Sequence, residues 1–230
     1  MKKQTAVKPD AAGNAFETAQ ATLLAPHALD QNALEQVFAQ MLAHKVDFAD
    51  LYFQYSRSEG WSLEEGIVKS GSFNIDQGVG VRAITGEKTA FAYSDDISLN
   101  ALTSAAQATR AIARQGGNAA TQIARRGNAH RLYLPQDPLA SLDAAAKVAL
   151  LEKIERKARA LDPRVTQVMA SLAGEFEVMM VVRSDGLMAA DVRPLTRMSL
   201  QVIVEQEFRR VQRRWRRAFR LRVLQRCGAR

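Results

Sequence analysis

The three histidines are the side chains with the most readily usable chemistry, because imidazole binds zinc and transfers protons near neutral pH. His27 falls in the amino-terminal tail, His44 at the end of an expected helix, and His130 in an expected linker. None has a second histidine, a cysteine or a carboxylate at the spacing of a metal-binding motif. The sequence therefore predicts no catalytic residue, no metal ligand and no cofactor in this chain, and it leaves the substrate-binding residues unknown.

Gly78-Val79-Gly80, followed by Gly86, has the composition of a phosphate-binding loop. Such a loop lies between a strand and a helix, so that the helix N-terminus receives the phosphate. Here strand-like residues continue after the glycines. We therefore expect a bulge or bend within a strand and no dinucleotide site.

Two adjacent acid pairs, Glu64-Glu65 and Asp95-Asp96, could in principle supply an acid and a base. Neighbouring side chains on a strand point to opposite faces, so Glu64 and Glu65 would not converge. Asp95 and Asp96 stand where the start of a helix favours acidic residues. Both pairs are expected to be structural.

The elements that would position these residues form two groups. Asp30 is a suitable N-cap for a first helix, and apolar residues follow it at helical spacing. The first group is a helix over about residues 31–44, strands at 50–55 and 61–69 with a turn at Glu59-Gly60, strands between 72 and 93 with a hairpin turn at 85–87, and a helix from 94–96 to about 114 closed by Gly116-Gly117.

The second group follows a Gly-, Asn- and Ala-rich linker that contains a short extended piece at residues 132–134. It consists of a helix over about 139–161, with Leu142, Ala146, Ala149, Leu150, Ile154 and Ala158 as its apolar side and Asp162-Pro163 as its end, and of strands at 165–182 and 188–205 joined by Ser184-Asp185-Gly186. A bend is expected at Gly174.

The fold class is therefore α+β, with antiparallel sheets and helices packed on one face, in two successive units. The expected domains are a disordered tail at residues 1–29, a first α+β domain at 30–117, a linker at 118–138, the start of a second α+β domain at 139–207, and an arginine-rich tail at 208–230.

The net positive charge of the chain comes from that last tail. Residues 208–230 hold 10 arginines and no acidic residue, while the whole chain has 32 basic and 24 acidic residues. The remaining body is therefore slightly acidic. With a single cysteine, no signal-peptide pattern and no apolar run of the roughly 20 residues that span a membrane, the chain is expected to be cytoplasmic without a transmembrane segment.

Residues 74–93, together with 50–54 and 190–194, closely resemble the amino-terminal half of the TldD/PmbA family of bacterial zinc metallopeptidases, also called modulators of DNA gyrase. The resemblance runs in order from about residue 30 to residue 205. It implies a cytoplasmic peptidase that degrades unfolded or small modified peptides, paired with a catalytically silent PmbA- or TldE-like subunit or with itself.

The resemblance also implies that the zinc ligands lie farther along the family's chain, in a His-Glu-x-x-x-His helix and a later cysteine. No residue here corresponds to them, so the chain is expected to be truncated before the metal site and inactive alone. The zinc belongs to the full-length family.

The arginine-rich tail has two interpretations. Residues 216–224 can be written in codons that, read one base later, spell Gly-Gly-Arg-Phe-Gly-Tyr-Glu-Tyr, close to a family motif, which predicts a frameshift near residues 205–208. Alternatively, Phe208, Val211, Trp215 and Phe219 stand at near-helical spacing, so the tail would be a basic amphipathic helix. Such a helix would make the chain a non-enzymatic module that associates with nucleic acid or an anionic membrane.

Overall fold

The computed structural model describes residues 15–43, 45–109, 121–123, 125–126, 133–206 and 209–219. Four α-helices and seven strands account for most of them. In chain order they are α1 (Ala15–Ala19), α2 (Gln31–Leu42), β1 (Phe48–Glu64), β2 (Ile67–Thr85), β3 (Lys88–Ser94), α3 (Leu99–Thr109), β4 (Arg125–Arg126), α4 (Ala144–Leu161), β5 (Val165–Arg183), β6 (Leu187–Gln206) and β7 (Arg209–Phe219). Short π and 3₁₀ turns, Gln20–Leu24 and Ala25–His27, join α1 to α2.

All seven strands belong to one sheet, with the order β3-β2-β1-β5-β6-β4 and with β7 on β6. Every pairing is antiparallel except that of β4 with β6. The pairing of β1 with β5 joins the strands of the two expected units into this single sheet. The α+β class with helices on one side of antiparallel strands is confirmed.

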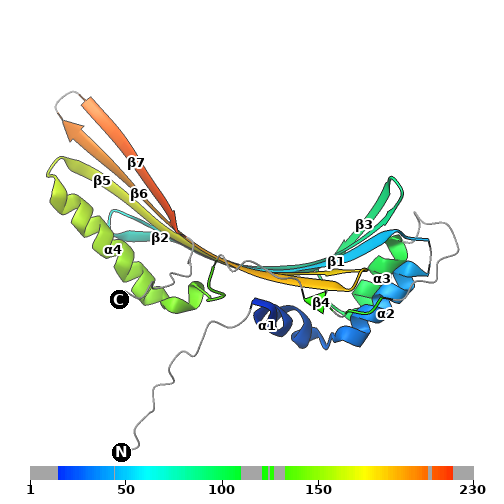
Figure 1. Ribbon diagram of the computed structural model, residues 1–230. Coiled ribbons are helices and arrows are strands. Elements are labelled where there is room, and N and C mark those ends of the chain that lie inside the picture. The colour runs from blue at the N-terminus through cyan, green and yellow to red at the C-terminus, as the bar shows by residue number, and fades with distance from the viewer. Residues whose placement is uncertain are drawn as a thin grey trace, which may run out of the picture.

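The sheet is strongly curved, and the helices lie on its convex side (Figure 1). α1, α2 and α3 lie beneath the end that carries β3, and α4 lies beneath the end that carries β7. The concave side carries no helix of the described part of the chain.

α2 forms as its sequence predicts. The Asp30 carboxylate accepts a hydrogen bond of 2.8 Å from the Ala33 amide and so caps the first turn. Its apolar residues pack on the convex face of β1 and β2. The fully buried members of this core include Leu34, Val37, Phe38, Met41, Leu51, Phe53 and Val81.

α4 differs from its expected form. It begins at Ala144, where the Asp143 carboxylate caps the Ala146 amide at 2.7 Å, and residue 139 belongs to a separate 3₁₀ turn. The expected apolar side is only partly right: Ala158 is buried and Ile154 packs against a small core, but Leu142 is 42% exposed and the other buried residues are Lys147, Leu151 and Glu155.

Ion pairs explain how charged residues occupy the buried side of α4. Lys147 pairs with Glu59 of β1 and donates a 2.7 Å hydrogen bond to the Leu139 carbonyl, while Arg159 pairs with Glu155 at 3.1 Å. Between them Leu151 packs with Leu63 and Ala170 in a small second core.

The turn expected at Glu59-Gly60 is also wrong. β1 continues through Gly60, which pairs with Ser72 on one side and Ala173 on the other. The chain reverses at Glu65 and Gly66 instead, which have φ angles of 52° and 73°. A glycine readily adopts the positive φ that such a turn requires.

Other turns match the sequence more closely. β2 and β3 are joined around Gly86, and β5 and β6 around Gly186, as expected. β5 runs without interruption past Gly174. α3 begins at residue 99, a few residues later than expected, and the Ser98 hydroxyl accepts a hydrogen bond from the Ala101 amide. The expected end of this helix, and most of the linker, lie outside the described residues.

The arginine-rich segment is a strand where it is described. β7 pairs with β6 in an antiparallel register that runs from Gln206 opposite Arg209 to Thr196 opposite Phe219. The amphipathic helix inferred from the spacing of Val211, Trp215 and Phe219 is therefore wrong. On the edge of β6 that faces away from β5, β4 pairs only with Leu187 and Met188, so the main-chain groups of residues 196–206 can pair with β7.

Candidate functional site

Alternate residues of β1 point away from the helices and onto the concave face. Leu51 and Phe53 are fully buried on the helix side, so Tyr52, Gln54 and Ser56 face the other way. β2 and β5 flank β1. Across the register these three residues lie opposite Gly80, Gly78 and Asp76 of β2, and opposite Val181, Met179 and Glu177 of β5.

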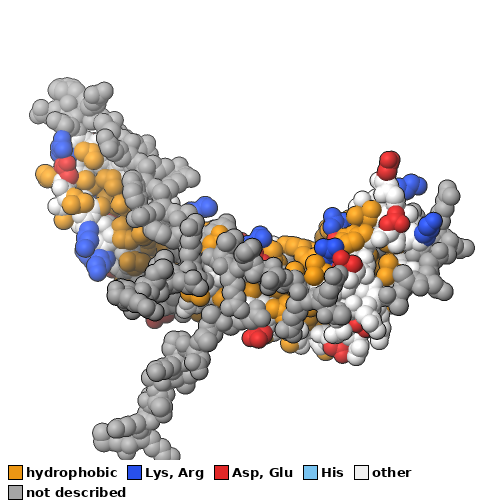
Figure 2. Space-filling view, viewed as in Figure 1, with side chains coloured by type: hydrophobic (Ala, Val, Ile, Leu, Met, Phe, Trp, Pro, Cys, Tyr) orange, Lys and Arg blue, Asp and Glu red, His pale blue; other side chains and the backbone are white. Residues whose placement is uncertain are grey.

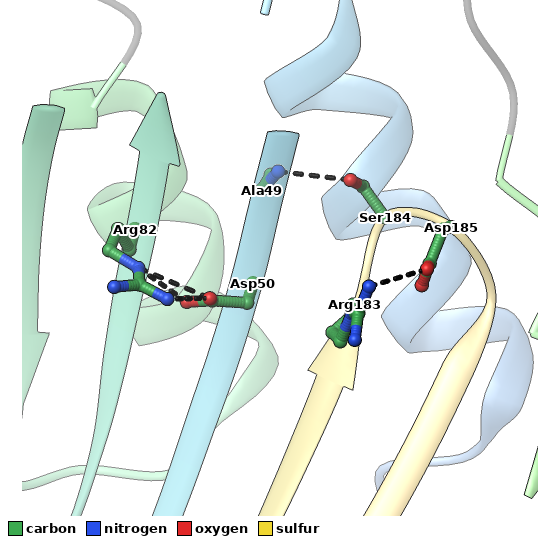
Figure 3. Close-up of polar contacts among 6 residues, drawn as sticks. All are labelled: Ala49, Asp50, Arg82, Arg183, Ser184 and Asp185. Carbon is green, nitrogen blue, oxygen red and sulfur yellow. Dashed lines mark hydrogen bonds and ion pairs between the residues drawn. The ribbon is translucent and has the colours of Figure 1, made fainter. Parts of the chain in front are cut away.

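One end of this face is fixed by contacts between the hairpins (Figure 3). The Arg82 guanidinium contacts both carboxylate oxygens of Asp50, with 3.1 Å from Nε to each, and this contact raises the pKa of Arg82. The Ala49 amide donates to the Ser184 hydroxyl at 2.9 Å, and the Ser184 amide donates to the Ala49 carbonyl at 2.8 Å. The two hairpin ends are thus joined through β1.

The middle of the face is polar. Gln54 donates to a Glu177 carboxylate oxygen at 2.6 Å, and Arg193 of β6 pairs with Asp191 at 2.8 Å. The half-buried Tyr52 hydroxyl lies 4.0 Å from the Met179 sulfur. Its pKa is raised, chiefly because burial disfavours the phenolate and further because Glu177 is nearby, with Arg193 acting in the opposite direction.

Next to Tyr52 the face contains a cavity of about 430 Å³. β1 contributes Tyr52, Gln54 and Ser56, β2 contributes residues 76–80, and the β3 end contributes Phe91, Tyr93, Ser94 and Asp95. Phe91 and Tyr93 are 65% and 74% exposed. Figure 2 shows hydrophobic side chains gathered on the concave side near β3, with charged side chains around them.

The two glycines of the sequence Gly78-Val79-Gly80 allow β3 to approach this closely. A Cβ on Gly80 would lie 2.9 Å from the Phe91 ring, and a Cβ on Gly78 would lie 2.9 Å from the Ser94 carbonyl oxygen. Both glycines lie in an unbroken part of β2, whose register with β1 is irregular only between Ser62 and Leu63. The expected bulge or bend is therefore wrong, and close packing is the reason for the glycines.

The two acid pairs are separated. Glu64 accepts a hydrogen bond of 2.5 Å from Gln167, while Glu65 occupies the turn after β1. Asp95 lines the cavity, whereas Asp96 accepts a hydrogen bond of 2.7 Å from Ser98 before α3. Neither pair converges on one point.

The three sequence segments that carry the family resemblance lie in strands of this face, with β5 between the first two segments and the third. Residues 50–54 form part of β1, residues 74–93 form most of β2 and β3, and residues 190–194 lie in β6, where Arg193 approaches Tyr52 closely enough to influence its pKa. The family-like segments therefore contribute to β1, β2, β3 and β6 of the concave face and, through β1, β2 and β3, to the cavity.

Comparison with known protein families agrees with this placement. The family model described as PmbA/TldA metallopeptidase domain 1 matches residues 49–113, and the model described as the central domain of the same metallopeptidases matches residues 137–225. Together they cover most of the chain. The chain belongs to the PmbA/TldD metallopeptidase family. The central-domain match includes β7.

The curated relatives of this family member are longer than the chain. It is 46% identical over 191 residues to a metalloprotease TldD homolog of Haemophilus influenzae, a match that covers 82% of the chain and 40% of the relative. It is 36% identical over 189 residues to the metalloprotease TldD homolog of Buchnera aphidicola subsp. Schizaphis graminum, a match that covers 82% of the chain and 39% of the relative. The chain thus spans about two fifths of their length.

Solved structures show the same fold at low sequence identity. A candidate modulator of a DNA gyrase from Thermotoga maritima has a TM-score of 0.66 and 14% identity, covering 83% of this chain and 43% of that one. TldE from Thermococcus kodakarensis has a TM-score of 0.64 and 15% identity, covering 82% and 42%. These likenesses concern the fold.

The described residues of this family member do not fit a zinc ion. No group of three or more histidine, cysteine, aspartate or glutamate side chains in the described ranges is placed to hold a metal. His27 lies in the turn before α2. His44, His130 and Cys227 lie outside the described residues.

Among the described helices, none combines the length and the apolar character that crossing a membrane requires.

Proposed function

We propose that this chain is the substrate-holding, non-catalytic part of a TldD-type zinc metallopeptidase that degrades unfolded or small modified peptides in the cytoplasm with a PmbA- or TldE-like subunit. The observation that carries the proposal is the concave face, to which the family-like segments contribute and which bears a cavity of about 430 Å³. An extended chain fits such a face because it presents side chains and main-chain groups along its whole length.

The free edge of β2 supports binding through the main chain. β3 pairs with β2 only from Val79 to Thr85, and residues 67–77 of β2 have no neighbour on that side among the described strands. Their amide and carbonyl groups can form a ladder with an unfolded peptide, whose own main-chain groups are unpaired along its length.

Two assays on the 230-residue chain test this function. We expect it to bind a fluorescein-labelled unfolded peptide without cleaving it, with or without added zinc, because its sequence contains no His-Glu-x-x-x-His motif. Peptide cleavage by the purified chain, or absence of binding to any unfolded peptide, would contradict the proposal.

The arginine-rich segment offers the alternative, a nucleic-acid or anionic-membrane binding module. Its support is the charge of residues 208–230 alone. Binding through that charge would fall steeply with salt and would not depend on sequence. Salt-sensitive binding without sequence preference would therefore reflect only the charge of the segment, whereas a salt-resistant, sequence-selective DNA complex would show a specific binding role and favour this alternative over the peptidase role.

We further propose that residues 208–230 follow a frameshift. The support is the abrupt change in composition, together with the fact that residues 216–224 can be written in codons that spell Gly-Gly-Arg-Phe-Gly-Tyr-Glu-Tyr when read one base later. Sequencing the gene tests it. If the shifted frame lacks the glycine-rich motif and a downstream His-Glu-x-x-x-His codon series, the segment is in its native frame and β7 is an ordinary strand of the domain.

A further inference from the structure

We propose that the cavity beside Tyr52 is a subsite for a basic side chain, lysine or arginine, of an extended peptide lying along the free edge of β2. The proposal rests on the peptide-holding function above and adds a side-chain preference to it. Three aromatic rings and two carboxylates line the cavity: Tyr52, Phe91 and Tyr93, with Asp76 and Asp95.

The aromatic part of the cavity favours a cation with an apolar stem. Phe91 and Tyr93 come from alternate positions of β3 and stand on the concave face opposite Arg82 and Gly80. An aromatic face attracts an ammonium or guanidinium group, and the methylene stem of lysine or arginine packs on the same rings. A neutral polar side chain would gain neither contact to the same extent.

The carboxylates give the cavity a negative charge. No lysine or arginine is among its lining residues. Asp76 accepts a hydrogen bond from the neutral Asn74 amide, and neither it nor Asp95 has an ion pair with a described basic side chain. The nearby acids Asp50 and Asp191 differ, because each is paired with an arginine. The two cavity carboxylates are therefore free to receive a cation from outside.

The position of the cavity connects it to the free edge. β3 ends at Ser94, opposite Val79, and the chain leaves the sheet at Asp95. The unpaired edge of β2 begins at about that point and runs back to Ile67. A peptide strand paired with residues 67–77 would continue the line of β3, and its first concave-facing side chain would enter the cavity.

Matched peptides measure the preference directly. The probe is a fluorescein-labelled decapeptide of serine, threonine and valine with one central arginine, compared with the same peptide carrying citrulline, which has the shape of arginine without its charge. From one cation–π contact and one or two exposed ion pairs we expect the arginine peptide to bind about fivefold to tenfold more tightly. The preference should weaken at high salt.

Variants locate the preference in the cavity. Asp76→Asn with Asp95→Asn should bring the two affinities to within about twofold, since both carboxylates are removed. Glu65→Gln with Glu87→Gln is the matched control, because it removes two exposed acids at hairpin turns outside the cavity, and it should keep the preference. Tyr93→Leu keeps the apolar surface and loses a ring, so it should reduce the preference without involving either carboxylate.

The outcomes separate this inference from the function it rests on. Equal affinity for the arginine and citrulline peptides would overturn the basic subsite while leaving peptide holding intact. A preference that survives in both the Asp76/Asp95 and the Tyr93 variants would also overturn it, by locating the selectivity elsewhere. Failure of every peptide to bind would overturn both proposals.

Discussion

Arg82 of β2 holds both carboxylate oxygens of Asp50 of β1, and the Asp50 residue is only 6% exposed although its partner is half in solvent. The pair lies at the end of the concave face where β1, β2 and β5 are joined. It therefore orders the strands on which the cavity depends.

Replacing Asp50 should destabilise the chain more than replacing an exposed acid nearby. In Asp50→Ala, water can solvate part of the Arg82 guanidinium and so replace part of the lost contact. We therefore expect this variant to lower the free energy of unfolding by about 1–2 kcal/mol. Glu87→Ala, which removes an exposed acid from the turn between β2 and β3, is the control and should cost less than about 0.5 kcal/mol. Urea unfolding measures both, and equal losses would contradict the structural role of Asp50.

The two glycines of β2 should differ in their tolerance of alanine. A Cβ on Gly78 meets the backbone carbonyl of Ser94, whereas a Cβ on Gly80 meets the exposed ring of Phe91, which can move. We expect Gly78→Ala to cost about 1–3 kcal/mol of stability and Gly80→Ala to cost less. Thermal unfolding of the two variants provides the comparison. The reverse order would show that β3 does not approach β2 as described.

The contribution of Lys147 to stability should depend on Glu59. Both side chains are largely buried, so Lys147→Met leaves the Glu59 carboxylate without its ion-pair partner and should cost about 2–4 kcal/mol. Adding Glu59→Gln removes that uncompensated charge, and the double variant should be more stable than Lys147→Met alone. The exposed pair Arg156 and Glu152 is the matched control. If the losses of stability in Lys147→Met and Glu59→Gln simply add in the double variant, the two side chains do not interact.

Asp162 should titrate at unusually low pH. Hydrogen bonds from the Arg164 side chain and amide lower its pKa to about 2. A lowered carboxyl pKa in the folded state stabilises that state above the unfolded pKa, and this contribution is lost as the pH falls toward about 2. Arg164→Ala should raise the pKa toward the ordinary 3.8. Carboxyl-carbon NMR over this pH range measures it, and an unchanged pKa in the variant would contradict the assigned cause.

Local signals were sufficient for parts of the fold. The Asp30 cap and the apolar spacing that follows it predict α2, and Gly86 and Gly186 mark the two hairpins because both have positive φ. The same reasoning fails at Gly60, because a glycine in a strand and a glycine in a turn look alike until the pairing is known. It fails in part on α4, where ion pairs allow Lys147 and Glu155 to be buried while Leu142, expected on the buried side, is exposed.

The candidate site could not be derived from local patterns. Tyr52, Asp76 and Tyr93 each stand at an alternating position of a strand, but only the register of three strands brings them to one cavity. The one available signal was the pair of exposed aromatic residues at positions 91 and 93, which alternation places on the same face of a hairpin. The family-like segments marked the right strands without indicating that a cavity lies between them.

The pairing of β1 with β5 has a consequence for synthesis on the ribosome. β1 can close its hairpin with β2 as soon as both have emerged, but its other edge pairs with residues 169–183, more than a hundred positions later. Contacts so distant in sequence form slowly. Until β5 emerges, β1 presents an unpaired central edge to the cell, and for that interval the nascent chain needs protection from pairing with other chains.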